Sequence, residues 1–241
     1  MSATVSFIGG AGEVFEADAG HDIDDARGRG LLVPREIRDM AVAVPAPAML
    51  LGVRLAFPDP ALGTAGIVLR RPVPGDVPWI TAACSDRELS RYVPAIPYPY
   101  SESDARTFVE HAGRGWAEGS GATFVIAHPA GSGLGTIGLH LFTNDAGLAE
   151  VGYWLRREAR GHGAATVAVR LVSDWAFATL GIGRLNLMTA PENLASQRVA
   201  ERAGFTREGL LRAWMPTRDG RRDCVMFSLL PDDMNREPAD P

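Results

Sequence analysis

A short loop of small residues is the part of this chain whose residue types most plainly indicate chemistry. Arg160-Gly161-His162-Gly163-Ala164-Ala165 lies between the strand-like run Glu150–Leu155 and a helical pattern that begins near Ala164. A turn rich in glycine and alanine lets consecutive backbone N–H groups converge on one point, and the following helix adds the positive end of its dipole. The loop therefore predicts a cradle for an anion, and a pyrophosphate would fit it.

Two polar residues open a second helix farther along the chain. Arg184–Thr189 reads as a strand, Pro191–Ser196 begins a helix of about two turns, and Ala203-Gly204-Phe205 ends that helix. Asn193 and Ser196 thus present an amide and a hydroxyl at the helix start. Each has a structural alternative, since Asn193 is also a common N-cap residue and Ser196 could simply bond to the backbone.

The order of these pieces carries a family resemblance. Strand, Arg-x-x-Gly-x-Ala, helix, strand, Asn-x-x-Ser, helix, Gly-Phe and strand resembles the GNAT acyltransferases. A finer match is to the branch that includes the RimJ/RimL-type acetyltransferases of ribosomal-protein N-termini, over roughly Ile67 to Asp233. The matching pieces are Glu150–Leu155, Arg160–Gly163, Asn193 with Ser196, Gly204-Phe205, and Asp219–Asp223 ahead of Val225–Leu229.

This resemblance implies a fold and a cofactor. The expected fold class is α/β (α+β): a mixed, mostly antiparallel twisted sheet of about seven strands, with helices on both faces and a splay near Tyr153 and Leu187. The cofactor is acetyl-CoA, whose pantetheine arm would pair with the backbone of the strand that holds Tyr153. The implied cofactor-binding residues are Tyr153, Trp154, Leu155, Arg160, Gly161, His162, Gly163, Ala164, Ala165, Asn193 and Ser196.

The reaction that the resemblance implies needs a proton acceptor for the amine and a proton donor for the departing thiolate. Many GNATs place a tyrosine donor seven residues after the asparagine, but Ala200 stands there in this chain. Ser196 is then the candidate acid and Glu150 the candidate base. Asp223 is the second candidate base, and an exposed strand carboxylate or a turn residue is the structural alternative for each acid.

The same loop matches a nicotinamide dinucleotide site less well. The dinucleotide fingerprint needs Gly-x-Gly-x-x-Gly and an acidic residue about 20 positions later at a strand end. Here Thr166 stands in the place of the third glycine, and the next strand ends in Met188-Thr189. We therefore set this reading aside.

Composition limits the remaining classes. The chain has 241 residues with 46% hydrophobic content, enough for one good core with an appendage. Its formal net charge of −5 argues against a nucleic-acid-binding module. All 24 basic residues are arginine, so every cationic contact to a phosphate must come from arginine or from a helix end.

Domain limits are expected at residues 1–66, 67–233 and 234–241. The first segment holds nine acidic residues against five arginines and lies outside the resemblance, whereas the acetyltransferase domain and a short tail follow it. It could be a partly ordered extension that packs Leu50–Phe57 as an added strand, a disordered tail, or an over-long translated start. Partial order is the favoured interpretation.

Location and partners are predicted from what the sequence lacks. Cys84 and Cys224 have no further ligand at metal-binding spacing, which indicates no metal site and two buried thiols in a reducing compartment. No window approaches the ~18 uninterrupted apolar residues of a membrane span, so a cytoplasmic protein is expected. Its state would be monomeric or homodimeric.

The expected acceptor is a primary amine. By branch resemblance a protein N-terminal α-amine leads, and a small-molecule amine such as an antibiotic or metabolite is second. A catalytically weak, acyl-CoA-binding regulatory protein is the alternative from another class, because Ala200 removes the usual acid. The loop Tyr92–Tyr100 could form one wall of the acceptor pocket.

Overall fold

A mixed seven-stranded sheet carries the candidate residues, in a computed structural model that describes residues 54–59, 61–142, 145–217 and 220–235. The β4–β5 pair is parallel and the other five pairs are antiparallel, which confirms the predicted α/β fold with a mixed, mostly antiparallel sheet. The strands lie in the order β1 (Val68–Arg70), β2 (Gly121–Ala127), β3 (Gly133–Phe142), β4 (Asp145–Leu155), β5 (Arg184–Thr189), β7 (Gly220–Leu229) and β6 (Thr206–Thr217).

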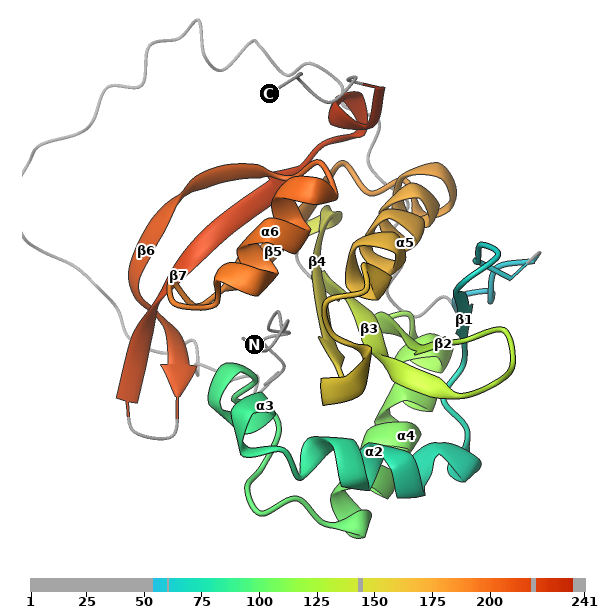
Figure 1. Ribbon diagram of the computed structural model, residues 1–241. Coiled ribbons are helices and arrows are strands. Elements are labelled where there is room, and N and C mark those ends of the chain that lie inside the picture. The colour runs from blue at the N-terminus through green and yellow to red at the C-terminus, as the bar shows by residue number, and fades with distance from the viewer. Residues whose placement is uncertain (1–53, 60, 143–144, 218–219, 236–241) are drawn as a thin grey trace, which may run out of the picture. The chain divides into compact units, whose positions relative to one another are not determined.

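The two central strands separate part-way along their length. The β4–β5 register holds three pairs and ends at Glu150 opposite Asn186. β4 nevertheless continues to Leu155, still paired with β3 on its other side, and β5 continues to Thr189, paired with β7. In Figure 1, α6 lies in front of β5, and α5 lies beside β4. The splay predicted near Tyr153 and Leu187 therefore lies just past the last pair.

Five α-helices accompany the sheet in the described part of the chain, and α4 is capped at both ends. The helices are α2 (Val77–Cys84), α3 (Arg87–Tyr92), α4 (Glu102–Glu118), α5 (Ala164–Leu180) and α6 (Leu194–Arg202), with short 3-10 turns at Pro74–Asp76, Arg157–Ala159 and Pro231–Asn235. Ser101 caps α4 in a capping box with Asp104, and Gly119 ends the helix at a φ of 72°.

The start of α2 holds a buried carboxylate. Asp76 occupies the N-cap position, but its carboxylate makes no cap bond to α2. It accepts instead from the backbone N–H of Val73 and from the indole of Trp79, and it pairs with the guanidinium of Arg70 at 2.6 Å. Asp76 is 3% exposed, so the buried carboxylate is stabilised by a charge and by two neutral donors.

Successive residues of β4 belong to two different hydrophobic cores. Tyr153 packs in the larger core with α5, whereas Trp154 packs with α2 and α3 in the second core. Because neighbouring side chains of a strand point to opposite faces, the two cores lie on opposite sides of β4. Trp175 of α5 contacts Phe124 and Trp116 in the larger core.

The described end of the N-terminal segment packs against the sheet. Leu55 is 3% exposed and its backbone N–H bonds to the carbonyl of Trp116 at 2.9 Å. The Phe57 ring lies 5.5 Å from the Trp116 ring and 5.7 Å from that of Phe124. Residues 54–57 form no strand, although Leu50–Phe57 was expected to add one. Residues 1–53 lie outside the described part of the chain.

Candidate active site

The glycine loop adopts the backbone shape that an anion cradle requires. Gly161 and Gly163 have φ values of 83° and 82°, in the left-handed region that glycine enters without strain. Gly163 is the N-cap of α5, and its carbonyl accepts the first helical bond from Val167. The amides of the first helical turn therefore have no intrahelical acceptor. Gly161, His162 and Gly163 are exposed while Ala164 and Ala165 are buried. This arrangement fits a phosphate group.

The side chain of Arg160, predicted to bind the cofactor, forms ion pairs within the protein. Its guanidinium is 4% exposed, donates to Glu88 at 2.9 Å and to Asp86 at 3.1 Å, and its Nε bonds to the Leu155 carbonyl. Its own backbone N–H bonds to Arg157. Arg160 therefore connects the start of α3 to the end of β4.

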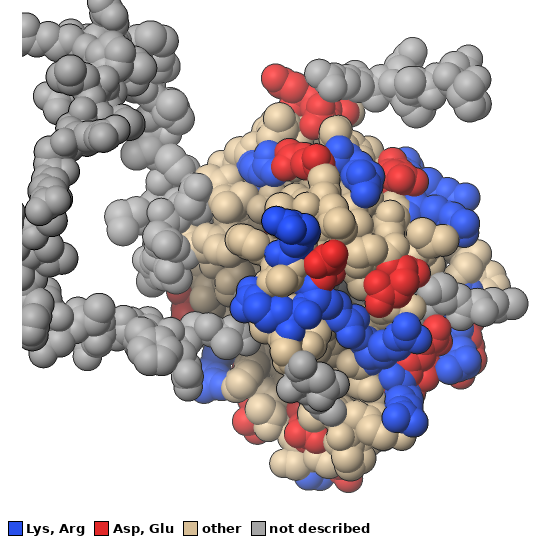
Figure 2. Space-filling model, turned by 90° about the vertical axis from the view of Figure 1, so that its left-hand side faces the viewer, with Lys and Arg blue, Asp and Glu red and all other residues tan. Residues whose placement is uncertain are grey.

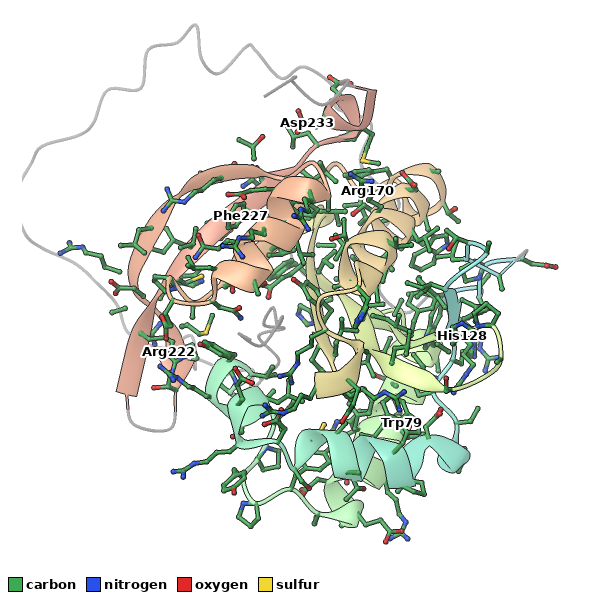
Figure 3. All side chains as sticks on the ribbon, in the orientation of Figure 1. Trp79, His128, Arg170, Arg222, Phe227 and Asp233 are labelled. Carbon is green, nitrogen blue, oxygen red and sulfur yellow. The ribbon has the colours of Figure 1, made fainter. Side chains whose placement is uncertain are left out.

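Trp154 and Leu155 contribute buried side chains. The Trp154 ring lies 5.9 Å from the ring of Trp79 in α2, on the face of β4 opposite Tyr153 (Figure 3 labels Trp79). Leu155 is 2% exposed in the larger core. Any contact of these two residues with a cofactor would come from the backbone of β4.

Ser196 lies at the start of α6, against β4. Its Oγ atom is 3.0 Å from the hydroxyl oxygen of Tyr153, and both residues are buried. The side-chain oxygen of Asn193 accepts from the backbone N–H of Ser196 at 3.2 Å, so Asn193 does cap the helix. Burial raises the pKa of Tyr153, although the Ser196 hydrogen bond opposes this shift. The tyrosine is accordingly a neutral hydroxyl near pH 7.

Glu150 lies at the last pair of β4 with β5, and it is 3% exposed. Glu150 and Trp154 are four positions apart on the same strand, so their side chains lie on the same face of β4. This face is opposite the one that carries Tyr153 and Ser196. The negative charge of Glu150 acts on the thiol of Cys224: burial mainly, and Glu150 in addition, raise the pKa of Cys224 to about 11. The two candidate catalytic residues therefore flank β4 from opposite faces where the strands diverge.

Ala200 and Asp223 are the other two positions that the sequence brought into the catalytic argument. Ala200 is fully buried in α6 and offers no hydroxyl. One carboxylate oxygen of Asp223 accepts from the backbone N–H of Ala213 at 2.8 Å. Ala213 has a φ of 50° in an irregular part of the β6–β7 pairing, so Asp223 stabilises this distortion.

The sequence prediction missed the partners of Arg160. Asp86 caps α3 through a bond to the amide of Glu88, and both carboxylates then contact Arg160 and Arg157. The cap pattern was visible in Ser85-Asp86-Arg87-Glu88. The pairing of Asp86 and Glu88 with Arg160, more than 70 positions away, could not be seen in the sequence.

With this geometry in view, the profile described as the acetyltransferase (GNAT) domain matches residues 67–206. The chain belongs to the GNAT acetyltransferase family. This confirms the family predicted from the loop and the Asn-x-x-Ser helix start, and it makes the protein an acetyl-CoA-dependent acyltransferase.

Relatives agree with this assignment. The "Uncharacterized N-acetyltransferase p20" of Bacillus licheniformis is 31% identical over 170 residues, which are 70% of this chain and 95% of the relative. The "Putative ribosomal N-acetyltransferase YdaF" of Bacillus subtilis (strain 168) is 37% identical over 100 residues, 42% of this chain and 55% of that protein. The chain is thus similar to the RimJ/RimL-type branch.

Solved structures share the fold. A structure described as a "Probable acetyltransferase" is 28% identical with a TM-score of 0.65 and covers 70% of this chain and 96% of its own. RimL, described as a ribosomal L7/L12 alpha-N-protein acetyltransferase in complex with coenzyme A, is 19% identical with a TM-score of 0.65, covering 72% and 99%. Among the described helices of the present chain, none is long and apolar enough to cross a bilayer.

Proposed function

We propose that this GNAT enzyme acetylates a protein N-terminal α-amine by direct attack in a ternary complex. The acceptor class is supported by the relatives named for ribosomal and alpha-N-protein acetylation. The single observation that carries the chemistry is the position of Ser196 and Glu150 on opposite faces of β4, at the point where β4 and β5 part.

The cofactor would be held by backbone at both ends of this region. The amides of Gly161, His162, Gly163, Ala164 and Ala165 would bind the pyrophosphate, and β4 beyond Glu150 would pair with the pantetheine arm. Asn193 would add its side-chain NH₂, since its oxygen already caps α6. When bound, acetyl-CoA supplies an activated acetyl thioester.

Proton transfer would then be divided between two faces of the strand. Glu150, in the role of base, would take a proton from the attacking amine directly or through a water molecule. Ser196 Oγ, in the role of acid, would donate its hydrogen to the sulfur as this leaves as a thiolate, and Tyr153 would hold the serine hydroxyl in place through their hydrogen bond. Because the base and the acid lie on opposite faces of β4, they would not exchange a proton directly with one another.

The cysteines favour direct transfer over an acyl-enzyme. Burial raises the pKa of Cys84 to about 12 and that of Cys224 to about 11. A thioester exchange requires a thiolate, and at pH 7 these groups are thiols in all but a minute fraction of molecules. The described part of the chain therefore offers no cysteine nucleophile suited to ping-pong transfer.

A panel of acceptors tests this proposal. Release of free CoA would be followed with short peptides bearing a free α-amine, with N-terminally blocked peptides that keep an internal lysine, and with small amines including aminoglycosides. We expect the free α-amine peptides to be preferred, with the acetyl group located at the N-terminus by mass spectrometry. Preference for a small amine would favour the second candidate acceptor, and tight acetyl-CoA binding without CoA release would favour the regulatory-protein alternative.

A further inference from the structure

A cavity lined by arginines lies between α3 and the β6–β7 hairpin. Its volume is about 570 Å³, and Arg87, Arg91 and Arg222 contribute three cationic side chains to its lining. Tyr98, which is 45% exposed, forms an aromatic wall beside them, and the guanidinium of Arg87 lies 5.8 Å from the ring centroid. Figure 3 places Arg222 on the β6–β7 hairpin, near α3.

Two of these arginines have no acidic partner among the described residues. Arg87 and Arg91 are exposed, and no carboxylate of the described chain lies within 4.0 Å of either guanidinium. Glu88, the acid of the cavity lining, is 2.9 Å from Arg160 and 3.7 Å from Arg157. The cavity is therefore cationic, although the chain as a whole has a net charge of −5.

The third arginine joins the cavity to the candidate active site. Arg222 Nη1 donates to the carbonyl of Arg91 at 3.0 Å and lies 3.8 Å from a carboxylate oxygen of Glu192. Glu192 directly precedes Asn193, the cap of the helix that carries Ser196. On the other side, Arg160 ties the start of α3 to the end of β4. The cavity is thus linked through Arg222 and Glu192 to the helix that carries Ser196. It is also linked through α3 and Arg160 to the end of β4, ahead of the glycine loop.

We propose that this cavity binds an acidic group of the acceptor, a carboxylate or a phosphate, through Arg87 and Arg91. The proposal rests on the proposed acetyl transfer to an amine and narrows its acceptor to amines that carry an anion. Planar guanidinium groups bind carboxylate and phosphate oxygens in pairs, which fixes orientation as well as charge. Figure 2 shows that arginines gather across the face that carries β6 and β7, where such an acceptor would first meet the protein.

Two matched pairs of acceptors test the charge requirement and its source. The first pair is a peptide beginning Ser-Asp-Glu and the same peptide beginning Ser-Asn-Gln. The second pair is 2-aminoethyl phosphate and 2-aminoethanol. We expect wild-type kcat/KM to favour the acidic member of at least one pair by about tenfold or more, and the favoured pair identifies a peptide or a small-molecule source.

Variants then assign the preference to the cavity. Arg87→Gln and Arg91→Gln should each reduce it by roughly 3- to 10-fold, mainly through KM, and the double variant should nearly abolish it. Arg114→Gln removes an equally exposed charge from α4 and should leave the preference unchanged. The affinity for acetyl-CoA should be the same in these four variants as in wild type. Equal kcat/KM within both pairs, or an intact preference in the double variant, overturns the proposal.

Equilibrium binding separates this proposal from the proposed function. If wild type acetylates no member of either pair, the choice of amine acceptor is at fault, and calorimetric binding of the acidic peptide and of 2-aminoethyl phosphate still tests the cavity. Binding to wild type and to Arg114→Gln, but not to the double variant, upholds the anion site. Absence of binding, or equal binding to all variants, overturns it.

Discussion

The Oγ atom of Ser196 lies 3.0 Å from the hydroxyl oxygen of Tyr153, so a hydrogen bond between two hydroxyls joins α6 to β4. The pair is buried next to the point where β4 and β5 diverge. Because burial raises the pKa of Tyr153, its hydroxyl keeps its proton near pH 7. In the proposed reaction the serine of this pair would donate a hydrogen bond to the departing sulfur, which Ala200 cannot do.

Ser196→Ala should lower kcat by roughly 10- to 1000-fold with little change in acetyl-CoA affinity, because a proton donor to the leaving sulfur acts only as the C–S bond breaks. Tyr153→Phe should lower kcat less, by about tenfold. Steady-state kinetics and calorimetric affinities measure both effects.

Ser173→Ala is the matched control for these variants. Ser173 is fully buried in α5, and its Oγ atom has no hydrogen-bond partner among the described residues. Its loss should leave kcat unchanged. If Ser196→Ala instead weakens acetyl-CoA binding at constant kcat, Ser196 is a cofactor contact and not the acid.

Glu150→Gln should reduce kcat/KM for the amine most at neutral pH and recover as pH rises. At high pH the acceptor is already a free amine, so the enzyme need not remove its proton. A pH–rate profile of the variant against wild type measures this difference. An unaltered profile would move the role of base to another group, with Asp223→Asn tested next.

The same variant has a readout that does not depend on catalysis. The negative charge of Glu150 contributes to the raised pKa of Cys224, so Glu150→Gln should lower that pKa and speed alkylation of Cys224 at pH 9 to 10. Cys84, whose raised pKa is due to burial and not to Glu150, serves as the internal control.

Local patterns in the sequence determined most of what could be predicted. The positive φ values of Gly161 and Gly163 and the Asn193 helix start follow from neighbours within a few positions. The fold was implied by the family resemblance that the order of such pieces carries. Each of these features depends on short-range backbone geometry, which residue types reveal directly.

Long-range pairing of charges could not be predicted in the same way. The guanidinium of Arg160 bonds to carboxylates that precede it by more than 70 positions, and no local pattern reveals this pairing. The arginines at positions 87, 91 and 222 meet around one cavity only because α3 and the β6–β7 hairpin are neighbours in space. Leu55 falls within the expected N-terminal extension, yet it is buried. Its burial depends on Trp116 and on the sheet, which lie far from it in the sequence.

Gly163→Val should weaken acetyl-CoA binding by more than tenfold, as measured by calorimetry. A Cβ atom at this position meets open space, so the effect comes from the φ of 82°, which a β-branched residue strongly disfavours. The loop would change conformation and redirect its amides. Gly163→Asn, which tolerates this conformation better, should bind with intermediate affinity.

Gly131→Val gives the matched control for that substitution. Gly131 has a φ of 98° and equally open space, but it lies in the β2–β3 turn. Its substitution should carry a similar backbone cost without loss of acetyl-CoA affinity. Equal affinity in Gly163→Val and wild type would remove the phosphate-loop assignment.

Leu55→Ala should lower the free energy of unfolding by about 2–4 kcal/mol, because it leaves a cavity beside Trp116 in the larger core. Urea denaturation measures the change. Leu210→Ala, at a side chain that is 47% exposed, should have little effect. A negligible cost at Leu55 would support a catalytic unit that starts near residue 67, whereas the expected cost extends the packed unit to at least residue 54.

Asp76→Asn should destabilise the protein by about 1–3 kcal/mol at pH 7, since Arg70 loses its charged partner while the remaining oxygen can still accept hydrogen bonds. Burial alone would raise the pKa of Asp76, but Arg70, Trp79 and Val73 outweigh it and hold the pKa below its usual value. A carboxylate with a depressed pKa stabilises the fold fully above its unfolded value of about 3.9, and this stability is lost as pH falls through the folded value. The difference between wild type and Asp76→Asn should therefore shrink as pH is lowered from 7 to about 3, when measured by urea denaturation at each pH.

Glu118→Gln, at an exposed position at the end of α4, should show almost no difference at either pH. An Asp76→Asn difference that is equally large at both pH values would mean that packing, and not the charge of Asp76, stabilises this corner of the fold.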